Sequence, residues 1–218
     1  MKKLSLTILV ILLSLSAFAQ IPYFSGTVGE RKLYGYTSLK FRPGLNAMET
    51  YSTLQYGVGE HFAAGMDLYT GSDAAYWGAV VRYGYKFSQW FGAGAQFTPS
   101  FDLNDSFRYS YSTASLYLNG AITRDGRLFW IYNTFCGLNR GEVADTFTNY
   151  EYLGYSIPFA SGHSITPLVG AIHSWKFDSP VDLAFGFWYT IKTWSFYLWT
   201  NDILKQNPRI VFGVEFVL

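Results

Sequence analysis

The stretch that decides the fold is Val181–Lys192, which reads VDLAFGFWYTIK. Its odd-numbered positions are all apolar, while its even-numbered positions mix small, polar and charged residues with a single tryptophan. Successive residues of a β-strand point to opposite faces, so the pattern has the period of a strand and not that of a helix. It predicts a strand with one apolar and one mixed, largely polar face.

The same alternation recurs along the chain, most clearly at Ala75–Phe87 and Arg209–Leu218. After the first twenty residues, no segment reaches the 18 or so consecutive apolar residues of a transmembrane helix. Counting the alternating segments gives twelve strands, whereas merging the pair at 181–201 or losing the weak segment near 146 gives ten. The twelve predicted ranges are 33–42, 48–58, 62–70, 75–87, 90–99, 107–122, 127–138, 146–157, 163–176, 181–192, 194–201 and 209–218.

The composition indicates where the apolar faces point. Of the 218 residues, 50% are hydrophobic, 20% aromatic and 14% charged, whereas soluble domains carry about 25% charged residues. Strands of transmembrane barrels have about 9–11 residues, with apolar side chains toward lipid and polar side chains inside. The sequence therefore predicts an all-β fold, a transmembrane antiparallel up-and-down β-barrel of about 12 strands with short loops. The apolar content excludes disorder, and the near-equal numbers of 16 basic and 15 acidic residues argue against nucleic acid as a partner.

The first residues have the pattern of an export signal. Met1-Lys2-Lys3 gives a positive start, Leu4–Leu15 is largely apolar, and Ala17-Phe18-Ala19 matches the small-residue cleavage pattern. The expected organisation is a cleaved signal peptide at 1–19, a lead segment at 20–32 and the barrel at 33–218.

Both ends of the chain also carry features of a known group. The signal ending Ala17-Phe18-Ala19-Gln20 looks like those of Bacteroidetes, and the last strand, Arg209–Leu218, is similar to the C-terminal signal that the barrel-assembly machinery recognises. Phe212, Phe216 and Leu218 carry that similarity, although such signals usually end in an aromatic residue. The chain thus resembles the small outer-membrane β-barrel proteins of Gram-negative bacteria. The resemblance implies a place in the cell outer membrane, contact with its lipid and assembly by that machinery.

Charged side chains are expected inside the barrel, because Lys or Arg at the lipid midplane costs about 2–4 kcal/mol. Assigning the polar face of each strand to the interior gives a mildly basic set. These charges either pair and plug the interior or line a polar passage. The predicted interior residues are Lys40, Arg42, Glu49, Asp67, Arg82, Lys86, Glu151, Lys176, Asp182, Lys192, Arg209 and Glu215.

Small and aromatic residues on the same faces set the expected width of the interior. Twelve strands leave a narrow aqueous interior, whereas about eight leave room only for side chains. Six inward glycines are expected to widen it, namely Gly78, Gly84, Gly92, Gly94, Gly186 and Gly213. Five inward aromatic residues are expected to narrow it, namely Tyr34, Tyr36, Tyr51, Tyr76 and Trp188.

These features favour a passive role. The first hypothesis is a narrow porin-like channel for small polar solutes, and the alternative is a structural or interaction barrel with a plugged interior that docks another envelope protein. A lipid-modifying outer-membrane enzyme is the third hypothesis. It is disfavoured because the residues of each pair, His163-Ser164 and His173-Ser174, point to opposite faces and form no local dyad. Three histidines and the single Cys136 show no metal-ligand spacing, so neither a metal nor another cofactor is expected.

Overall fold

The structure, a computed structural model, describes residues 26–44, 46–139, 142–160, 162–175 and 180–218. The signal peptide at 1–19 and the start of the lead segment lie outside these ranges and stay predictions. The described residues contain no helix that is long and apolar enough to cross a membrane. Their strands are β1 (Leu33–Arg42), β2 (Asn46–Gly57), β3 (Phe62–Thr70), β4 (Ala75–Lys86), β5 (Gly92–Asp102), β6 (Arg108–Ala121), β7 (Leu128–Asn139), β8 (Glu142–Tyr155), β9 (Ile157–Ala160), β10 (His163–Ser174), β11 (Asp182–Ile191), β12 (Trp194–Asn201) and β13 (Arg209–Val217).

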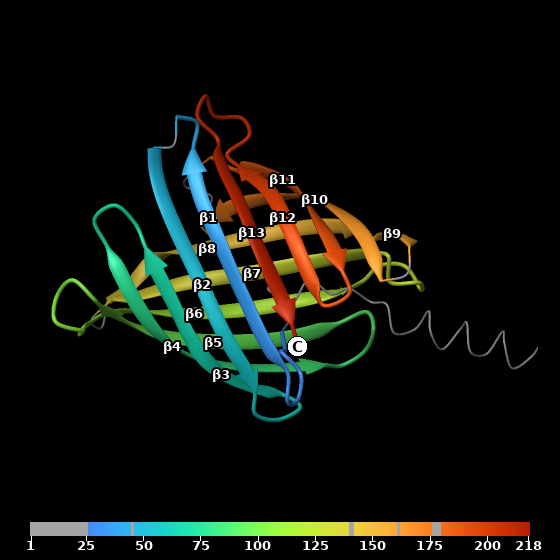
Figure 1. Cartoon of the computed structure of the whole chain (residues 1–218), viewed down its shortest axis with the longest axis horizontal. Coiled ribbons are helices and arrows are strands. Elements are labelled where there is room, and N and C mark those ends of the chain that lie inside the picture. The colour runs from blue at the N-terminus through green and yellow to red at the C-terminus, as the bar shows by residue number, and fades with distance from the viewer. Residues whose placement is uncertain (1–25, 45, 140–141, 161, 176–179) are drawn as a thin grey trace, which may run out of the picture.

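The long strands close into one ring, seen from the side in Figure 1. Apart from β8 and β9, strands that follow each other in the chain pair antiparallel, and β1 pairs with β13 from Tyr34↔Val217 to Phe41↔Ile210. The ring is completed where β10 pairs with β8 and β11. The predicted closed barrel of twelve strands is confirmed, and the ten-stranded alternative is wrong.

The short strand β9 continues β8 and adds no member to the ring. Both pair with the same side of β10, β8 from Leu168↔Gly154 upward and β9 around Ile165↔Ile157. Ser156 separates the two segments. The strand predicted at 146–157 is therefore longer than expected and interrupted near its end.

Side chains alternate between the two faces of the wall, as the sequence predicts. On β4, Val81 and Tyr83 are 44% and 54% exposed on the outside, whereas Val80 and Arg82 are 1% and 2% exposed on the inside. On β11, Phe185 lies outside and is 50% exposed. An apolar outer face around a polar and aromatic interior is the arrangement of transmembrane barrels.

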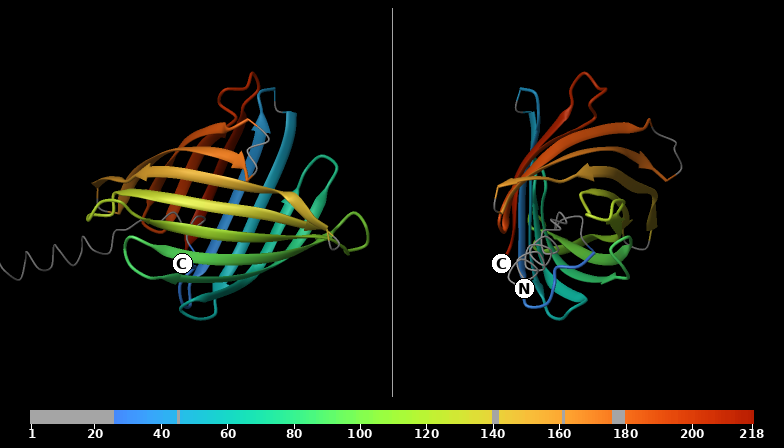
Figure 2. Two further views of the ribbon diagram at one scale, coloured as in Figure 1. Left: turned by 180° about the vertical axis from the view of Figure 1, so that it is seen from behind. Right: turned by 90° about the vertical axis from the view of Figure 1, so that its right-hand side faces the viewer.

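The two ends of the ring differ. The terminal end holds the start of β1, the end of β13 and the connections 58–61, 87–91, 122–127 and 192–193. There Leu33 and Leu218 exchange two backbone hydrogen bonds of 2.8 Å, which lock the first strand to the end of the last. The loop end holds the connections 71–74, 103–107 and 202–208. In Figure 2 the β1–β2 and β12–β13 connections lie side by side at this end.

Candidate functional site

The barrel encloses a cavity of about 270 Å³ that lies toward the loop end. Its lining includes Asn201 and Arg209, which flank the connection 202–208. Aromatic rings dominate the wall: Tyr36, Tyr51, Tyr69, Tyr76, Tyr111, Tyr117, Phe135, Tyr150, Trp188, Tyr197 and Trp199. Small and amide groups fill the spaces between them: Thr53, Gln55, Gly78, Gln96, Thr98, Ser100, Thr113 and Ser115. Four of the five aromatic residues predicted to narrow the interior are in this lining.

A stack of aromatic rings forms part of the cavity floor. The rings of Tyr36 and Tyr197 are parallel within 3° at a centroid distance of 5.5 Å, and Trp188 stacks on the other side of Tyr197 at 5.2 Å. All three side chains are less than a tenth exposed and belong to the buried interior cluster that also contains Tyr34 and Leu168. Toward the terminal end the interior is thus filled with side chains.

Arg82 completes the floor on the opposite side. Its Nε donates a hydrogen bond of 2.9 Å to Oε1 of Gln96, and its guanidinium carbon lies 4.5 Å from the centre of the Tyr117 ring. A cation over an aromatic face is attracted by the ring quadrupole. This buried cation is therefore held in place by its neighbours while one edge still faces the cavity.

Asp67 is the carboxylate of the cavity wall. It is 7% exposed and accepts a 2.6 Å hydrogen bond from the hydroxyl of Tyr51. The ammonium group of Lys40 lies 5.9 Å from the centre of the same Tyr51 ring. Lys40, Arg82 and Arg209 against Asp67 leave the cavity wall with a small excess of positive charge.

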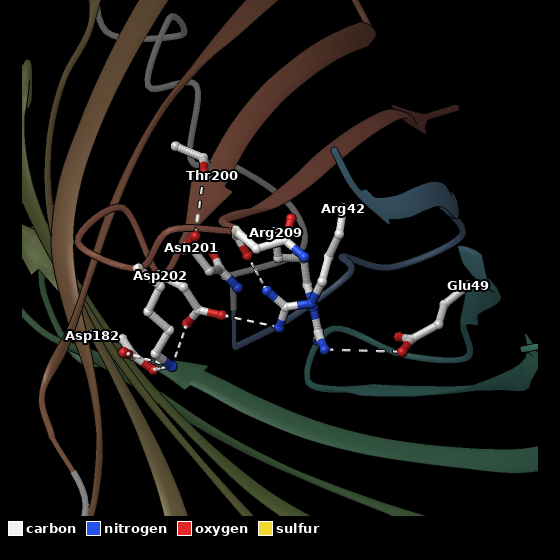
Figure 3. Close-up of polar contacts among 9 residues, drawn as sticks. Arg42, Glu49, Asp182, Thr200, Asn201, Asp202 and Arg209 are labelled. Atoms are coloured by element: carbon white, nitrogen blue, oxygen red, sulfur yellow. Dashed lines mark hydrogen bonds and ion pairs between the residues drawn. The ribbon is translucent and has the colours of Figure 1, made fainter. Parts of the chain in front are cut away.

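A network of opposite charges lies at the loop end, above the cavity (Figure 3). Arg42 reaches Asp202 at 3.3 Å and also donates to the carbonyl of Asn207. Lys205 contacts Asp182 at 3.0 Å and Asp202 at 3.3 Å. Arg209 and Glu49 lie 3.9 Å apart. We call these six side chains, Arg42, Glu49, Asp182, Asp202, Lys205 and Arg209, the rim network.

The rim network ties the connection 202–208 to β1 and β11. The carboxyl group of Asp202 loses solvent, which raises its pKa, but hydrogen bonds to Asp182, Lys205 and Arg42 together bring that pKa below its usual value. The hydrogen bond to Asp182 and the contact with Asp202 raise the pKa of Lys205. Sequence reasoning missed Asp202 and Lys205, since both lie in a connection where strand alternation has no meaning.

The remaining predicted interior residues are spread over the barrel. Glu215 is 1% exposed on the inner face of β13. Lys86 and Lys192 are exposed at the terminal end, and Lys192 belongs to the β11–β12 turn and not to a strand. The prediction that Lys192 lines the interior is therefore wrong. Lys176 lies outside the described residues.

Glu151 corrects another prediction, because it lies on the outer face of the wall. Its neighbours Tyr150 and Tyr152 both point inward, one into the cavity and the other into the buried cluster. Strand alternation then turns Glu151 outward. There its Oε1 lies 3.2 Å from Nε2 of His173, which is also on the outer face. The polarity of Glu151 predicts an inward position. In the structure its carboxylate instead has a polar partner, His173, on the outer face.

Four of the six inward glycines do not widen the interior, whereas Gly78 lines the cavity. A Cβ atom at Gly213 would overlap the hydroxyl of Tyr197, and one at Gly186 would overlap the side chain of Trp199. At Gly84 and Gly94 it would overlap the backbone of Gly26 in the lead segment. The expected widening is wrong at these four positions, because other parts of the chain occupy the space that the glycines leave.

The two histidines of the enzyme hypothesis have separate partners. Nδ1 of His163 lies 2.9 Å from the hydroxyl of Tyr189, and His173 contacts Glu151. Within the described ranges no group of three His, Cys, Asp or Glu residues could hold a metal ion.

The closed ring, its apolar outside and its lined cavity define a β-barrel of the transmembrane type. Solved structures share this fold. The KdgM porin matches with a TM-score of 0.59 and 12% identity over 84% of this chain and 98% of that chain. The NanC porin matches with a TM-score of 0.56 and 12% identity over 84% of this chain and 98% of that chain. A KdgM porin in complex with disordered oligogalacturonate gives a TM-score of 0.56 at 12% identity, over 85% and 98%. No family model matches the sequence, and no curated protein matches it.

Proposed function

We propose that the chain is an outer-membrane, porin-like channel for small polar solutes and that its cavity is the solute site. The observation that carries the proposal is the cavity itself, which lies inside a barrel with an apolar outer wall. Its volume of about 270 Å³ is near the lower end of the roughly 300–1,000 Å³ range of small-molecule sites. The fold shared with KdgM and NanC supports the proposal as an analogy.

The lining favours ring-shaped solutes that carry hydroxyl groups, such as sugars. Flat aromatic faces from Tyr69, Tyr76, Tyr111 and Trp199 offer apolar contact to a ring. Hydroxyl, amide and charged groups around them offer hydrogen bonds to its edge. The oligogalacturonate complex of KdgM shows that a barrel of this fold accommodates a saccharide. The small positive excess of this cavity suits neutral or weakly acidic sugars.

Single-channel conductance in a planar bilayer tests the proposal, after the refolded protein has shown heat-modifiable migration on a gel. We expect discrete steps, and we expect a monosaccharide to reduce or interrupt the current as it occupies the cavity. Liposome swelling with sugars of increasing size then measures the passage. A folded barrel that neither conducts ions nor admits sugars, even when Arg82→Ala opens the floor, would refute the channel function.

The buried floor favours one second candidate, an interaction barrel that docks another envelope protein. Tyr34, Tyr117 and Leu168 are each 1% exposed, so the terminal half is packed like a protein core. Such a barrel would lack conductance in every variant and would co-purify with a defined partner after crosslinking in intact cells. The two candidates thus predict opposite results in the same bilayer experiment.

A further inference from the structure

The lead segment before β1 runs into the barrel. Exposure falls steadily against the chain direction, from the exposed Glu30, Arg31 and Lys32 through half-buried Val28 to buried Gly26. The right-hand view of Figure 2 shows this blue segment turning away from the start of β1 and toward the green strands across the barrel. The lead therefore enters the terminal end and does not extend away from it.

The lead segment packs against two paired glycines, Gly84 and Gly94, which we call its seat. Gly84 on β4 and Gly94 on β5 are register partners, and both face the interior. The three atoms nearest to a Cβ atom at Gly84 all belong to Gly26 and Thr27, and a Cβ atom at Gly94 would also overlap Gly26. Any other residue at Gly84 would occupy the place where the lead backbone lies. The absence of a side chain is used here for close backbone approach.

A third glycine and an apolar contact hold the lead from the other side. The backbone N–H of Gly57 donates to the carbonyl of Lys32, and the N–H of Arg31 donates to the carbonyl of Gly57, both at 2.9 Å. A Cβ atom at Gly57 would overlap the carbonyl oxygen of Gly29. Val28 packs against the buried interior cluster. The lead thus has specific contacts on β2, β4 and β5.

The seat lies directly beneath the cavity floor. Arg82 and Gln96, which are hydrogen-bonded to each other, stand two residues from Gly84 and Gly94 on the same inner faces of β4 and β5. The lead therefore supports the floor from below and fills the terminal end of the path that a solute would take.

We propose that residues 26–32 are a built-in plug, seated on Gly84 and Gly94, which fills the terminal end of the barrel beneath the side-chain floor and lowers the conductance; when the plug leaves, the floor loses its support and the passage widens. The inference rests on the proposed channel function and adds its regulation. Withdrawal of the plug breaks contacts that include two backbone hydrogen bonds to Gly57 and the packing of Gly26 and Val28. Local opening of this size is the kind that proteins undergo without global unfolding.

Gly84→Val is the sharpest variant, because the atoms nearest to its Cβ atom would be those of the lead. The matched control is Gly59→Val at the same end of the barrel, where a Cβ atom meets nothing within 4 Å. Deletion of residues 26–29 removes the part of the plug that lies against Gly84 and Gly94, without any substitution in the wall. To follow the lead directly, Thr27→Cys is placed in wild type, Gly84→Val and Gly59→Val together with Cys136→Ser, and the labelling rate by a water-soluble maleimide is measured in these three proteins. The bilayer conductance of these proteins, without the label, and of the deletion variant is the second readout.

We expect Thr27→Cys to be labelled about tenfold faster in Gly84→Val than in wild type or Gly59→Val. Conductance should rise in Gly84→Val and in the deletion variant, and Gly59→Val should behave as wild type. Equal labelling rates in all backgrounds would show that the lead is not seated and would overturn the proposal. Faster labelling in Gly84→Val, with equal and measurable conductance in all proteins, would show that the lead does not control the conductance. That result would overturn the plug proposal and leave the channel function standing. Absence of conductance from every protein, the deletion included, would instead refute the channel function.

Discussion

The ring of Phe216 lies on the outer wall directly over Gly35, across the seam where the last strand meets the first. A Cβ atom at Gly35 would overlap this ring, and Gly35↔Phe216 are register partners. Trp194 on the other neighbouring strand packs against the same ring at a centroid distance of 4.8 Å. A side chain of β13 thus spans the three strands β12, β13 and β1 at the place where the barrel closes.

Phe216→Ala is therefore expected to weaken the closed barrel. Loss of the ring removes the contacts with Gly35 and Trp194 and lowers the unfolding free energy by roughly 1–2 kcal/mol. Urea titration in detergent, followed by gel mobility, measures the change. Phe212→Ala is the matched control, since Phe212 is on the same face of the same strand and is 51% exposed. Equal losses in the two variants would contradict the role of the seam.

Deletion of residues 216–218 is expected to abolish assembly. It removes Phe216, and it removes Leu218 with both of its backbone hydrogen bonds to Leu33. Immunoblotting of outer-membrane fractions for the heat-modifiable band checks this result. Normal insertion of the truncated chain would refute the assembly signal predicted at Phe212, Phe216 and Leu218.

Two carboxylates, Asp67 and Glu151, allow a test of which face of the barrel wall determines the ion selectivity of the channel. Asp67→Asn is expected to shift the reversal potential of the channel toward anion selectivity, because it removes the carboxylate of the cavity wall. Glu151→Gln is expected to leave the reversal potential unchanged, because Glu151 lies outside beside His173. A shift of the same size in both variants would contradict the register of β8.

The rim network predicts a dependence on pH. The pKa of Asp202 is lowered in the folded protein. Its interactions with Arg42 and Lys205 are therefore fully formed above the ordinary carboxylate pKa of about 4 and are lost as the pH falls through the lower folded pKa. The pKa of Lys205 is raised in the folded protein. Its interactions with Asp182 and Asp202 are therefore fully formed below the ordinary lysine pKa of about 10.4 and are lost only as the pH rises through the higher folded pKa. A spin label at Gln206 should thus report a fixed connection at neutral pH and a mobile one in acid.

Asp202→Asn is the control for that measurement. The connection 202–208 should then be more mobile at neutral pH, with a smaller change on acidification. A label whose mobility changes equally with pH in both proteins would show that Asp202 does not hold the connection.

The architecture was accessible from sequence because it depends on local alternation. At Val80–Tyr83, neighbouring residues switch between the two faces, and the pattern survives any error of one or two residues at the strand ends. Glu151 could not be placed in the same way. Its strand carries aromatic residues on both faces, at Tyr150, Tyr152 and Tyr155, so polarity alone does not identify the inner one.

The contents of the interior could not be predicted, because they depend on contacts between distant parts of the chain. Gly26 meets Gly84, and Arg42 meets Asp202, across long sequence separations. A pattern with a period of two shows that an inward glycine leaves space, but it does not show which segment enters that space. Asp67 and Arg82, two of the residues predicted to lie inside, line the cavity, whereas the floor and the lead segment beneath it could be described only from the structure.

The pairing of β1 with β13 has a consequence for biogenesis. Every other junction of the ring joins segments that are close in the chain, but Tyr34 of β1 can pair with Val217 of β13 only after all the strands between them have been made. Until then, the first strand carries an unsatisfied edge that invites aggregation with other chains. A chain that stops before β13 would therefore form an open sheet with an aggregation-prone edge and not a smaller barrel. The outer-membrane location proposed above therefore requires the nascent polypeptide to stay unpaired until β13 is available to pair with β1.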